Sequence, residues 1–122
     1  MSGRRGVVFV IFDLPVKTGF ERKEYTSFRK NLIRSGYVFF QKSVYVKLLR
    51  NISSAQNEIN RVDRFAPKAG EIQTLTMNMN VFHTLYSVRG SGFSIEDFSD
   101  DVVFLGKEDS PEIDDEKLLG LR

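Results

Sequence analysis

The carboxylate with the most unusual sequence setting is Asp13, which follows the apolar run Val7–Phe12 and precedes Leu14-Pro15. A continuous run of β-branched and aromatic residues, bounded by Gly6 and a proline, predicts a strand that is buried on both faces and central in its sheet. Pro15 has no amide hydrogen for a sheet ladder, so this strand must end near Asp13. A carboxylate at the tip of a buried strand needs a cation, hydrogen bonds or water. Asp13 is therefore either a cation-binding residue or an Asx-turn residue that closes the strand.

The residue types in the chain argue against several other chemistries. There is no Cys and only one His, His83, which argues against a zinc site and excludes disulfides. Neither a nucleophile triad around His83 nor a phosphate loop at Gly90-Ser91-Gly92 fits the expected patterns. Magnesium remains, because it takes oxygen ligands and often only one or two carboxylates. Two copies of the chain around a two-fold axis would present Asp13 twice, and the bound ion would polarise a phosphodiester.

The net charge of +2 hides a strong asymmetry along the chain. Residues 1–89 contain 15 Lys and Arg against 6 Asp and Glu, a net +9, whereas residues 90–122 contain 3 against 10, a net −7. A basic body indicates a polyanion partner, DNA or RNA, held through its phosphates. An ordinary solvated helix face is the alternative. The candidate nucleic-acid-binding side chains are Arg4, Arg5, Lys17, Arg22, Lys23 and Lys42.

Hydrophobic periodicity predicts six elements around Asp13. The spacing Thr18-x-x-Glu21 is that of a capping box at a helix start, and Gly36 is suited to end that helix. The predicted order is strand 6–13, helix 18–35, strand 37–41, strand 43–49, helix 54–65 and strand 71–78. Only about one residue, Lys42, separates the second and third strands, which leaves open a very tight hairpin or one strand bent by a bulge. The basic side chains expected on the outward faces of the first helix are Arg22, Lys23, Arg29, Lys30 and Arg34.

This order predicts an α+β domain of ferredoxin-like βαββαβ type, with a four-stranded antiparallel sheet and both helices on one face. The other sheet face then needs a cover, and we expect a second copy there. A short helical turn at 81–86 and a short strand at 102–105, pairing with the partner's sheet, complete the expectation. The expected divisions are a domain at 1–89, an extension at 90–106 and an acidic, flexible tail at 107–122.

The composition of the chain bears on its cellular compartment. No apolar run approaches the roughly 20 residues of a membrane span, and no signal peptide is evident. Together with the lack of Cys, this favours a cytoplasmic protein without a membrane partner.

Three motifs also carry a resemblance to a known family. The first motif, at the end of the first strand, reads Ile-Phe-Asp-Leu-Pro from Ile11 to Pro15. The second, in the first helix, reads Glu-Arg-Lys-Glu-Tyr-x-x-Phe-Arg-Lys from Glu21 to Lys30. The third reads Gln-Lys-Ser-Val-Tyr-Val-Lys-Leu-Leu from Gln41 to Leu49. In this order they resemble the Cas2 family, the small CRISPR-associated proteins of spacer adaptation, in the branch that accompanies a single large effector nuclease. The resemblance extends from about Val7 to Gly106.

The resemblance implies a homodimer that joins the Cas1 integrase to capture foreign DNA and insert new spacers. It also implies a metal-dependent endonuclease, with Mg²⁺ or another divalent cation, acting on RNA or double-stranded DNA. The family's metal-binding Asp falls on Asp13, and its motif Ser falls on Ser43. Its basic residue after the first strand falls on Lys17 or Arg22. A non-catalytic DNA-binding scaffold and a toxin-type ribonuclease of the same fold are the alternatives.

Overall fold

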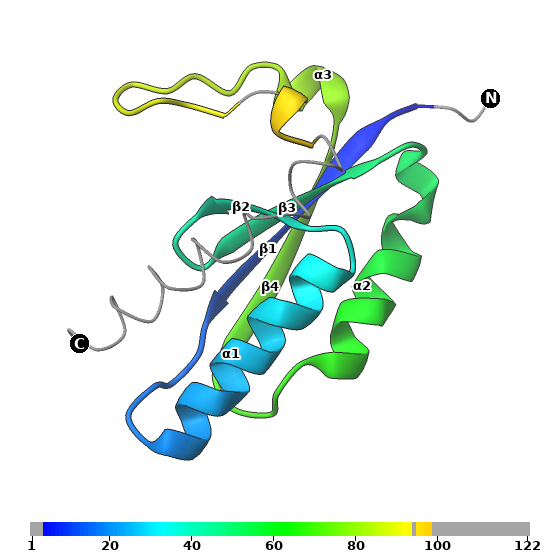
Figure 1. Cartoon of the computed structure of the whole chain (residues 1–122). Coiled ribbons are helices and arrows are strands. Elements are labelled where there is room, and N and C mark those ends of the chain that lie inside the picture. Colours follow the sequence, from blue (N-terminus) through cyan, green and yellow to red (C-terminus); the bar gives the residue numbers. More distant parts are fainter. Residues whose placement is uncertain (1–3, 94, 99–122) are drawn as a thin grey trace.

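One four-stranded antiparallel sheet organises the computed structural model, which describes residues 4–93 and 95–98. The strands lie in the order β2-β3-β1-β4, and the two long helices cover one face of the sheet (Figure 1). The strands are β1 (Gly6–Asp13), β2 (Val38–Gln41), β3 (Val44–Leu49) and β4 (Glu71–Asn78). The helices are α1 (Gly19–Arg34), α2 (Ala55–Phe65) and α3 (Met79–Phe82), with the 3₁₀ turns η1 (Ile52–Ser54) and η2 (Ile95–Phe98). The predicted ferredoxin-like α+β class is confirmed.

The central position predicted for the first strand is also confirmed. β1 pairs with β3 on one side and with β4 on the other, both antiparallel. Val7, Val8 and Val10 are 0% exposed. The apolar run is therefore explained by contact on both sheet faces, since a central strand with only one covered face would alternate with polar residues.

Local capping signals fix both ends of α1. The Thr18 hydroxyl accepts from the Glu21 amide, and the Glu21 carboxylate accepts from the Thr18 amide, so the capping box is complete. At the other end Gly36 has φ +98°, the Gly36 amide donates to Ile33, and the Tyr37 amide donates to Leu32. This is a Schellman motif. It explains why β2 begins at Val38 and not one residue earlier as predicted, because the amide of Tyr37 is already used by the helix end.

The connection between β2 and β3 is the predicted tight hairpin and not a single bent strand. Gln41 pairs with Val44, so Lys42 and Ser43 form a two-residue hairpin turn, and Ser43 takes the left-handed φ of 64°. The register also shifts between Phe39 and Gln41, which makes a bulge at that point. A bulge adds a residue to one strand and increases its twist, so both features fit into the same short connection.

The sheet separates two apolar clusters. Val8, Val10 and Phe12 point toward α1 and α2, where they pack with Phe28 and Leu32. The opposite cluster lies on the face that the two long helices leave open, and its members are Val7, Phe9, Val38, Val46 and Phe82, with Phe40, Met77, Phe93 and Phe98 packed against them.

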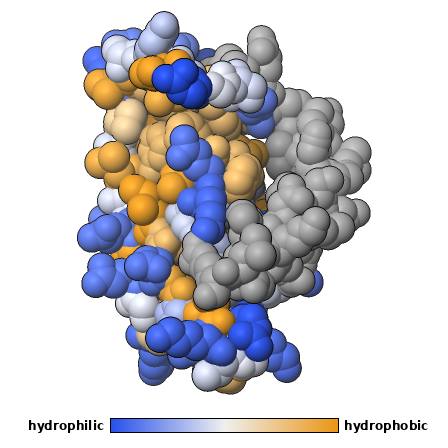
Figure 2. All heavy atoms as spheres, turned by 90° about the vertical axis from the view of Figure 1, so that its left-hand side faces the viewer, coloured by the Kyte–Doolittle hydropathy of each residue, from blue (hydrophilic) through white to orange (hydrophobic). Residues whose placement is uncertain are grey.

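The open face still presents apolar atoms to solvent. Leu75 is 52% exposed and Ile11 is 37% exposed on it. Figure 2, turned toward the left-hand side of Figure 1, shows apolar atoms gathered in the middle of the surface with hydrophilic atoms above and below. α3 begins at Met79, two residues earlier than the predicted turn, and it covers part of this face through Phe82. The predicted strand at 102–105 lies outside the described residues.

One expectation for α1 is wrong. Arg29 was expected on an outward face, but it is only 1% exposed, and its Nη1 donates to the Tyr45 hydroxyl at 2.9 Å. Its position four residues after Tyr25 places it on the inward stripe, where the Tyr45 hydroxyl accepts a hydrogen bond from the buried guanidinium. No helix in the described part of the chain has the length and apolarity of a membrane span.

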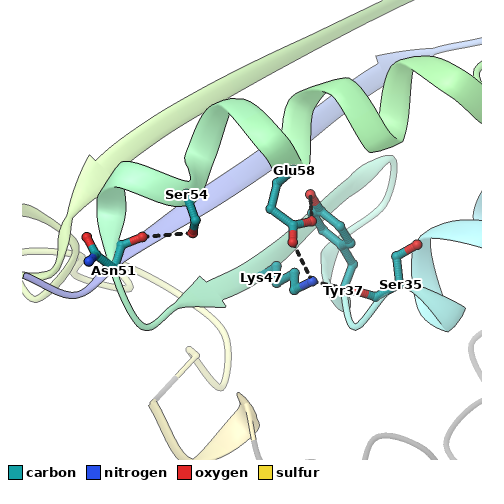
Figure 3. A network of polar contacts seen from close by, with 6 residues as sticks. All are labelled: Ser35, Tyr37, Lys47, Asn51, Ser54 and Glu58. Atoms are coloured by element: carbon teal, nitrogen blue, oxygen red, sulfur yellow. Dashed lines mark hydrogen bonds and ion pairs between the residues drawn. The ribbon is translucent and has the colours of Figure 1, made fainter. Parts of the chain in front are cut away.

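A polar cluster joins the end of α1 to β3 and α2 (Figure 3). The Lys47 ammonium donates to the Ser35 carbonyl at 2.7 Å and forms an ion pair with Glu58 at 2.8 Å. The Tyr37 hydroxyl donates to the other Glu58 oxygen at 3.4 Å. Burial, and then the neighbouring Glu58 carboxylate, raise the pKa of the Tyr37 phenol above its ordinary value. Lys47 thus neutralises Glu58 and also satisfies a carbonyl at the negative end of α1.

We predict that Glu58→Gln lowers the free energy of unfolding by about 2 kcal/mol, less than the ~3–5 kcal/mol for fully buried pairs, because Lys47 keeps some contact with water. Adding Lys47→Met should recover part of this loss, since the double variant has no unpaired ammonium. Urea unfolding measures both, with the exposed Asp63→Asn on the same helix as the control. A double variant that loses the full sum of the two single effects would contradict this coupling.

Candidate cation and nucleic-acid site

Asp13 lies at the end of the central strand on the open face of the sheet. Successive strand residues point to opposite faces, so Asp13 shares its face with Ile11 and Phe9, whereas Phe12 points toward the helices. Asp13 and Ile11 are the two exposed residues of β1. The carboxylate is therefore accessible, and it stands beside the apolar surface and not inside the helix-covered core.

Ser43 and Lys42 are brought to this same end of the sheet. The Phe12 amide donates to the Ser43 carbonyl at 3.1 Å, which fixes the β2–β3 turn next to the end of β1. Ser43 is partly buried and Lys42 is exposed. The two predicted site residues, Asp13 at the end of β1 and Ser43 in the β2–β3 turn, thus lie at the same end of the sheet.

A second carboxylate, Glu71, stands opposite Asp13. The first residue of β4 is the direct antiparallel partner of Asp13, and both side chains are exposed. Directly opposite residues on one face have Cβ atoms roughly 4.5–5.5 Å apart. Sequence reasoning missed Glu71 because its role depends on the long-range register of β1 against β4. The available signal was that the strand predicted at 71–78 begins with an acid just as the first strand ends with one.

The loop after Asp13 is held tightly by the start of α1. The Glu21 carboxylate accepts from the amides of Lys17 and Thr18 at 2.9 and 3.1 Å. The Arg22 guanidinium folds back and donates to the carbonyls of Val16 and Lys17 at 3.1 and 3.2 Å. Arg22 therefore binds its own loop, while the side chain of Lys17, in the loop that follows β1, is exposed.

The remaining predicted basic residues do not all gather here. Lys23 is exposed on the first turns of α1, near the same end as Lys17. Arg4 and Arg5 are exposed just before the start of β1, and seven residue steps along a strand separate Gly6 from Asp13, roughly 23 Å. These two arginines are too far from Asp13 to contact a phosphate bound there. They could contact only phosphates further along a bound nucleic acid.

The donor set at the end of β1 fits a hard cation. Within residues 4–93 and 95–98 no group of three or more His, Cys, Asp or Glu side chains gathers in one place. Asp13 and Glu71 nevertheless offer two carboxylates from one chain. Magnesium is commonly held by one or two carboxylates while water and substrate phosphates complete its octahedron. The carboxylate pair offers the kind of oxygen ligand that this ion takes, whereas it lacks the nitrogen or sulfur ligands that zinc prefers.

Together these features define a class: a ferredoxin-like α+β domain with paired strand-end carboxylates and a basic rim, as suits a small protein that acts on nucleic acid. Comparison with known proteins agrees. A family model described as "CRISPR associated protein Cas2" matches residues 7–84, which span β1 to just beyond α3. The chain belongs to the Cas2 family.

Relatives named "CRISPR-associated endoribonuclease Cas2" support this assignment. The protein from Ligilactobacillus salivarius strain UCC118 is 41% identical over 83 residues, 68% of this chain and 82% of the relative. The protein from Streptococcus mutans strain UA159 is 38% identical over 101 residues, 82% of this chain and 93% of the relative. The protein from Treponema denticola is 41% identical over 70 residues, 57% of this chain and 69% of the relative. The S. mutans match shows that similarity extends past the residues of the family model.

We predict that Glu71→Gln weakens divalent-cation binding by roughly tenfold, because affinity for hard cations follows the number of charged ligands. In EDTA the same substitution should raise the melting temperature slightly, because two like charges directly opposite one another destabilise a strand pair. Calorimetric Mn²⁺ titration and thermal melting measure the two effects, with Asp63→Asn as a control that removes a distant exposed carboxylate. Unchanged affinity together with unchanged melting would show that Glu71 is not part of the site.

Proposed function

We propose that this protein is a magnesium-dependent endonuclease that hydrolyses phosphodiester bonds, with RNA as the first substrate to test. The observation that carries this proposal is the exposed Asp13–Glu71 pair at the end of the central strand, with the basic residues Lys17 and Lys42 in connections at the same end of the sheet. The names of the relatives support RNA as substrate, since each is called an endoribonuclease.

In this mechanism each residue has a separate task. Asp13 and Glu71 would hold the cation, which would supply polarisation of the phosphodiester and a more acidic water ligand. Lys17 and Lys42 neutralise the phosphates on either side of the scissile bond. The Ser43 hydroxyl, fixed by its turn, donates a hydrogen bond to a phosphate oxygen. Arg22 keeps Lys17 in place through the two carbonyls that it binds.

A second copy of the chain is the proposed cover of the open face. Leu75 and Ile11 expose apolar surface there, and a short chain gains burial by association. A two-fold axis over this face would bring the Asp13 residues of both copies toward one another and add ligands for a shared cation. The homodimer would then be required for the complete site.

Membership of the Cas2 family supports a place in CRISPR adaptation. We propose that the dimer works with the Cas1 integrase when new spacers are captured from foreign DNA. The basic body, with net +9 over residues 1–89, would hold the DNA backbone, and the acidic residues 90–122 would repel it and contact the integrase instead.

Replacing the first carboxylate tests the proposed activity. Asp13→Asn should lower magnesium-dependent cleavage of single-stranded RNA at least ~100-fold, because losing several kcal/mol of charge stabilisation costs tenfold for each 1.4 kcal/mol. Cleavage of a fluorescently labelled RNA and of a duplex DNA, each with Mg²⁺ or EDTA, measures the effect. Asp63→Asn is the matched control, and gel filtration shows whether the oligomeric state is kept.

Two outcomes of this experiment would contradict the proposal. Cleavage that persists unchanged in the purified Asp13→Asn variant would place the catalytic group elsewhere. No cleavage of either nucleic acid by the unaltered protein, together with normal binding of duplex DNA, would favour a non-catalytic scaffold of the integrase complex.

A further inference from the structure

A second concave site lies at the same end of the sheet as Asp13, on the side of the helices. It is an apolar pocket of about 260 Å³ between the first turn of α1 and the segment that joins α2 to β4. Its lining residues are Leu14, Pro15, Phe20, Glu21, Glu24, Pro67, Lys68 and Ala69. The mechanism proposed above uses none of these side chains on a ligand.

The walls of this pocket are fixed before anything binds. Pro15 and Pro67 restrict the backbone on the two sides. The loop that carries Pro15 is held by the Glu21 carboxylate and by the Arg22 guanidinium, through the hydrogen bonds to residues 16–18 described above. A preformed apolar concavity with a few polar residues at its rim is the usual form of a ligand site.

Phe20 is the most unusual residue of the pocket. It is 70% exposed although it stands in the first turn of α1, and it contributes to the lining. A large apolar side chain that stays exposed beside an apolar concavity is a common feature of interaction sites. The exposed ring can serve as a platform on which a flat group stacks.

The pocket adjoins the backbone of Asp13. Leu14 lines the pocket and directly follows Asp13. On the other wall, Gly70 approaches so closely that an added Cβ would lie 2.7 Å from the Asp13 carbonyl oxygen and 2.8 Å from a Leu14 methyl carbon. The loop of Lys68 and Ala69 is thereby held against the end of β1. The pocket and the carboxylate pair thus lie at the same end of the sheet, on opposite faces.

We propose that this pocket holds one unpaired nucleobase of the nucleic-acid strand, stacked on Phe20. The volume suits a single flat ring, since it is smaller than the roughly 300–1,000 Å³ of pockets for drug-sized ligands. Lys68 on the lining and Lys17 on the neighbouring loop supply the positive charge that the attached phosphates require. Glu21 is already engaged by backbone amides, so Glu24 is the lining carboxylate that can accept from a base N–H.

The effect of this pocket on substrate choice rests on the proposed function, cleavage of nucleic acid. Base stacking requires a nucleotide that is not paired, so the pocket would make the protein prefer single-stranded or frayed nucleic acid over a blunt duplex. Phe20 would then be a specificity-determining residue, whereas the carboxylates at the end of β1 remain the catalytic site.

The chain contains no Trp, which allows a direct test. Phe20→Trp keeps a stacking surface and introduces the only indole in the protein. Its fluorescence should be quenched on titration with a short single-stranded oligoribonucleotide in EDTA, and much less by the same sequence as a blunt duplex. Tyr86→Trp is the control, because Tyr86 is 81% exposed and lies in the segment after α3, away from this pocket.

Two further variants separate stacking from simple apolar contact. Phe20→Ala and Phe20→Leu should each weaken single-strand binding by roughly tenfold, the size of one lost base–aromatic stack, and Phe20→Trp should restore it. In cleavage assays the loss should appear mainly in KM. The high exposure of Phe20 means that these changes leave the packed core intact.

The results of the Phe20 experiments can be told apart from those of the Asp13→Asn experiment. Quenching that persists when Asp13→Asn is added, together with lost cleavage, supports both proposals. No quenching by any single strand, with unchanged affinity in Phe20→Ala, would overturn the base-binding inference. The occupant of the pocket would then be an apolar side chain of a protein partner. Equal quenching by the blunt duplex would also overturn it. Neither of these results would affect the role proposed for Asp13.

Discussion

The structure depends on a sheet whose central strand must be buried on both faces although the two long helices cover only one. The period of two along β1 sends Val8, Val10 and Phe12 into the helix-side core. The same alternation sends Phe9, Ile11 and Asp13 to the other face. Among the described residues, α3, Phe93 and Phe98 cover this face only in part. The carboxylate is therefore on the face that still exposes apolar surface, and this is why the proposed cation site and the proposed second copy are linked.

Local signals in the sequence predicted most of this fold. The capping box at Thr18, the stop at Gly36 and the apolar run of β1 each depend on residues close together in the chain, and each is confirmed. Arg29 was misplaced because its burial depends on the Tyr45 hydroxyl, sixteen residues away on β3. Glu71 was missed for the same reason, since only the register of β4 against β1 places it opposite Asp13. Periodicity identifies a face, but it does not identify the partner across a sheet.

The two ends of the sheet have different characters. At the end of β1 stand the carboxylate pair, the rigid Lys42-Ser43 turn, the loop clamped by Arg22 and the apolar pocket at Phe20. At the start of β1 the amides of Ile52 and Met79 donate to the carbonyls of Arg4 and Arg5, which ties η1 and α3 to the strand. The polar cluster around Lys47 then fixes both helices on the sheet. The chemistry we propose is thus confined to one end of a rigid frame.

The central claim is that the Asp13 residues of two copies share one cation on the face that the helices leave open. Electron paramagnetic resonance of Mn²⁺, added in steps to the unaltered protein, counts bound ions directly because the free ion gives the sharp signal. Sharing predicts saturation at one tightly bound ion for every two chains. Saturation at one ion per chain, or no tight binding at all, would contradict the shared site.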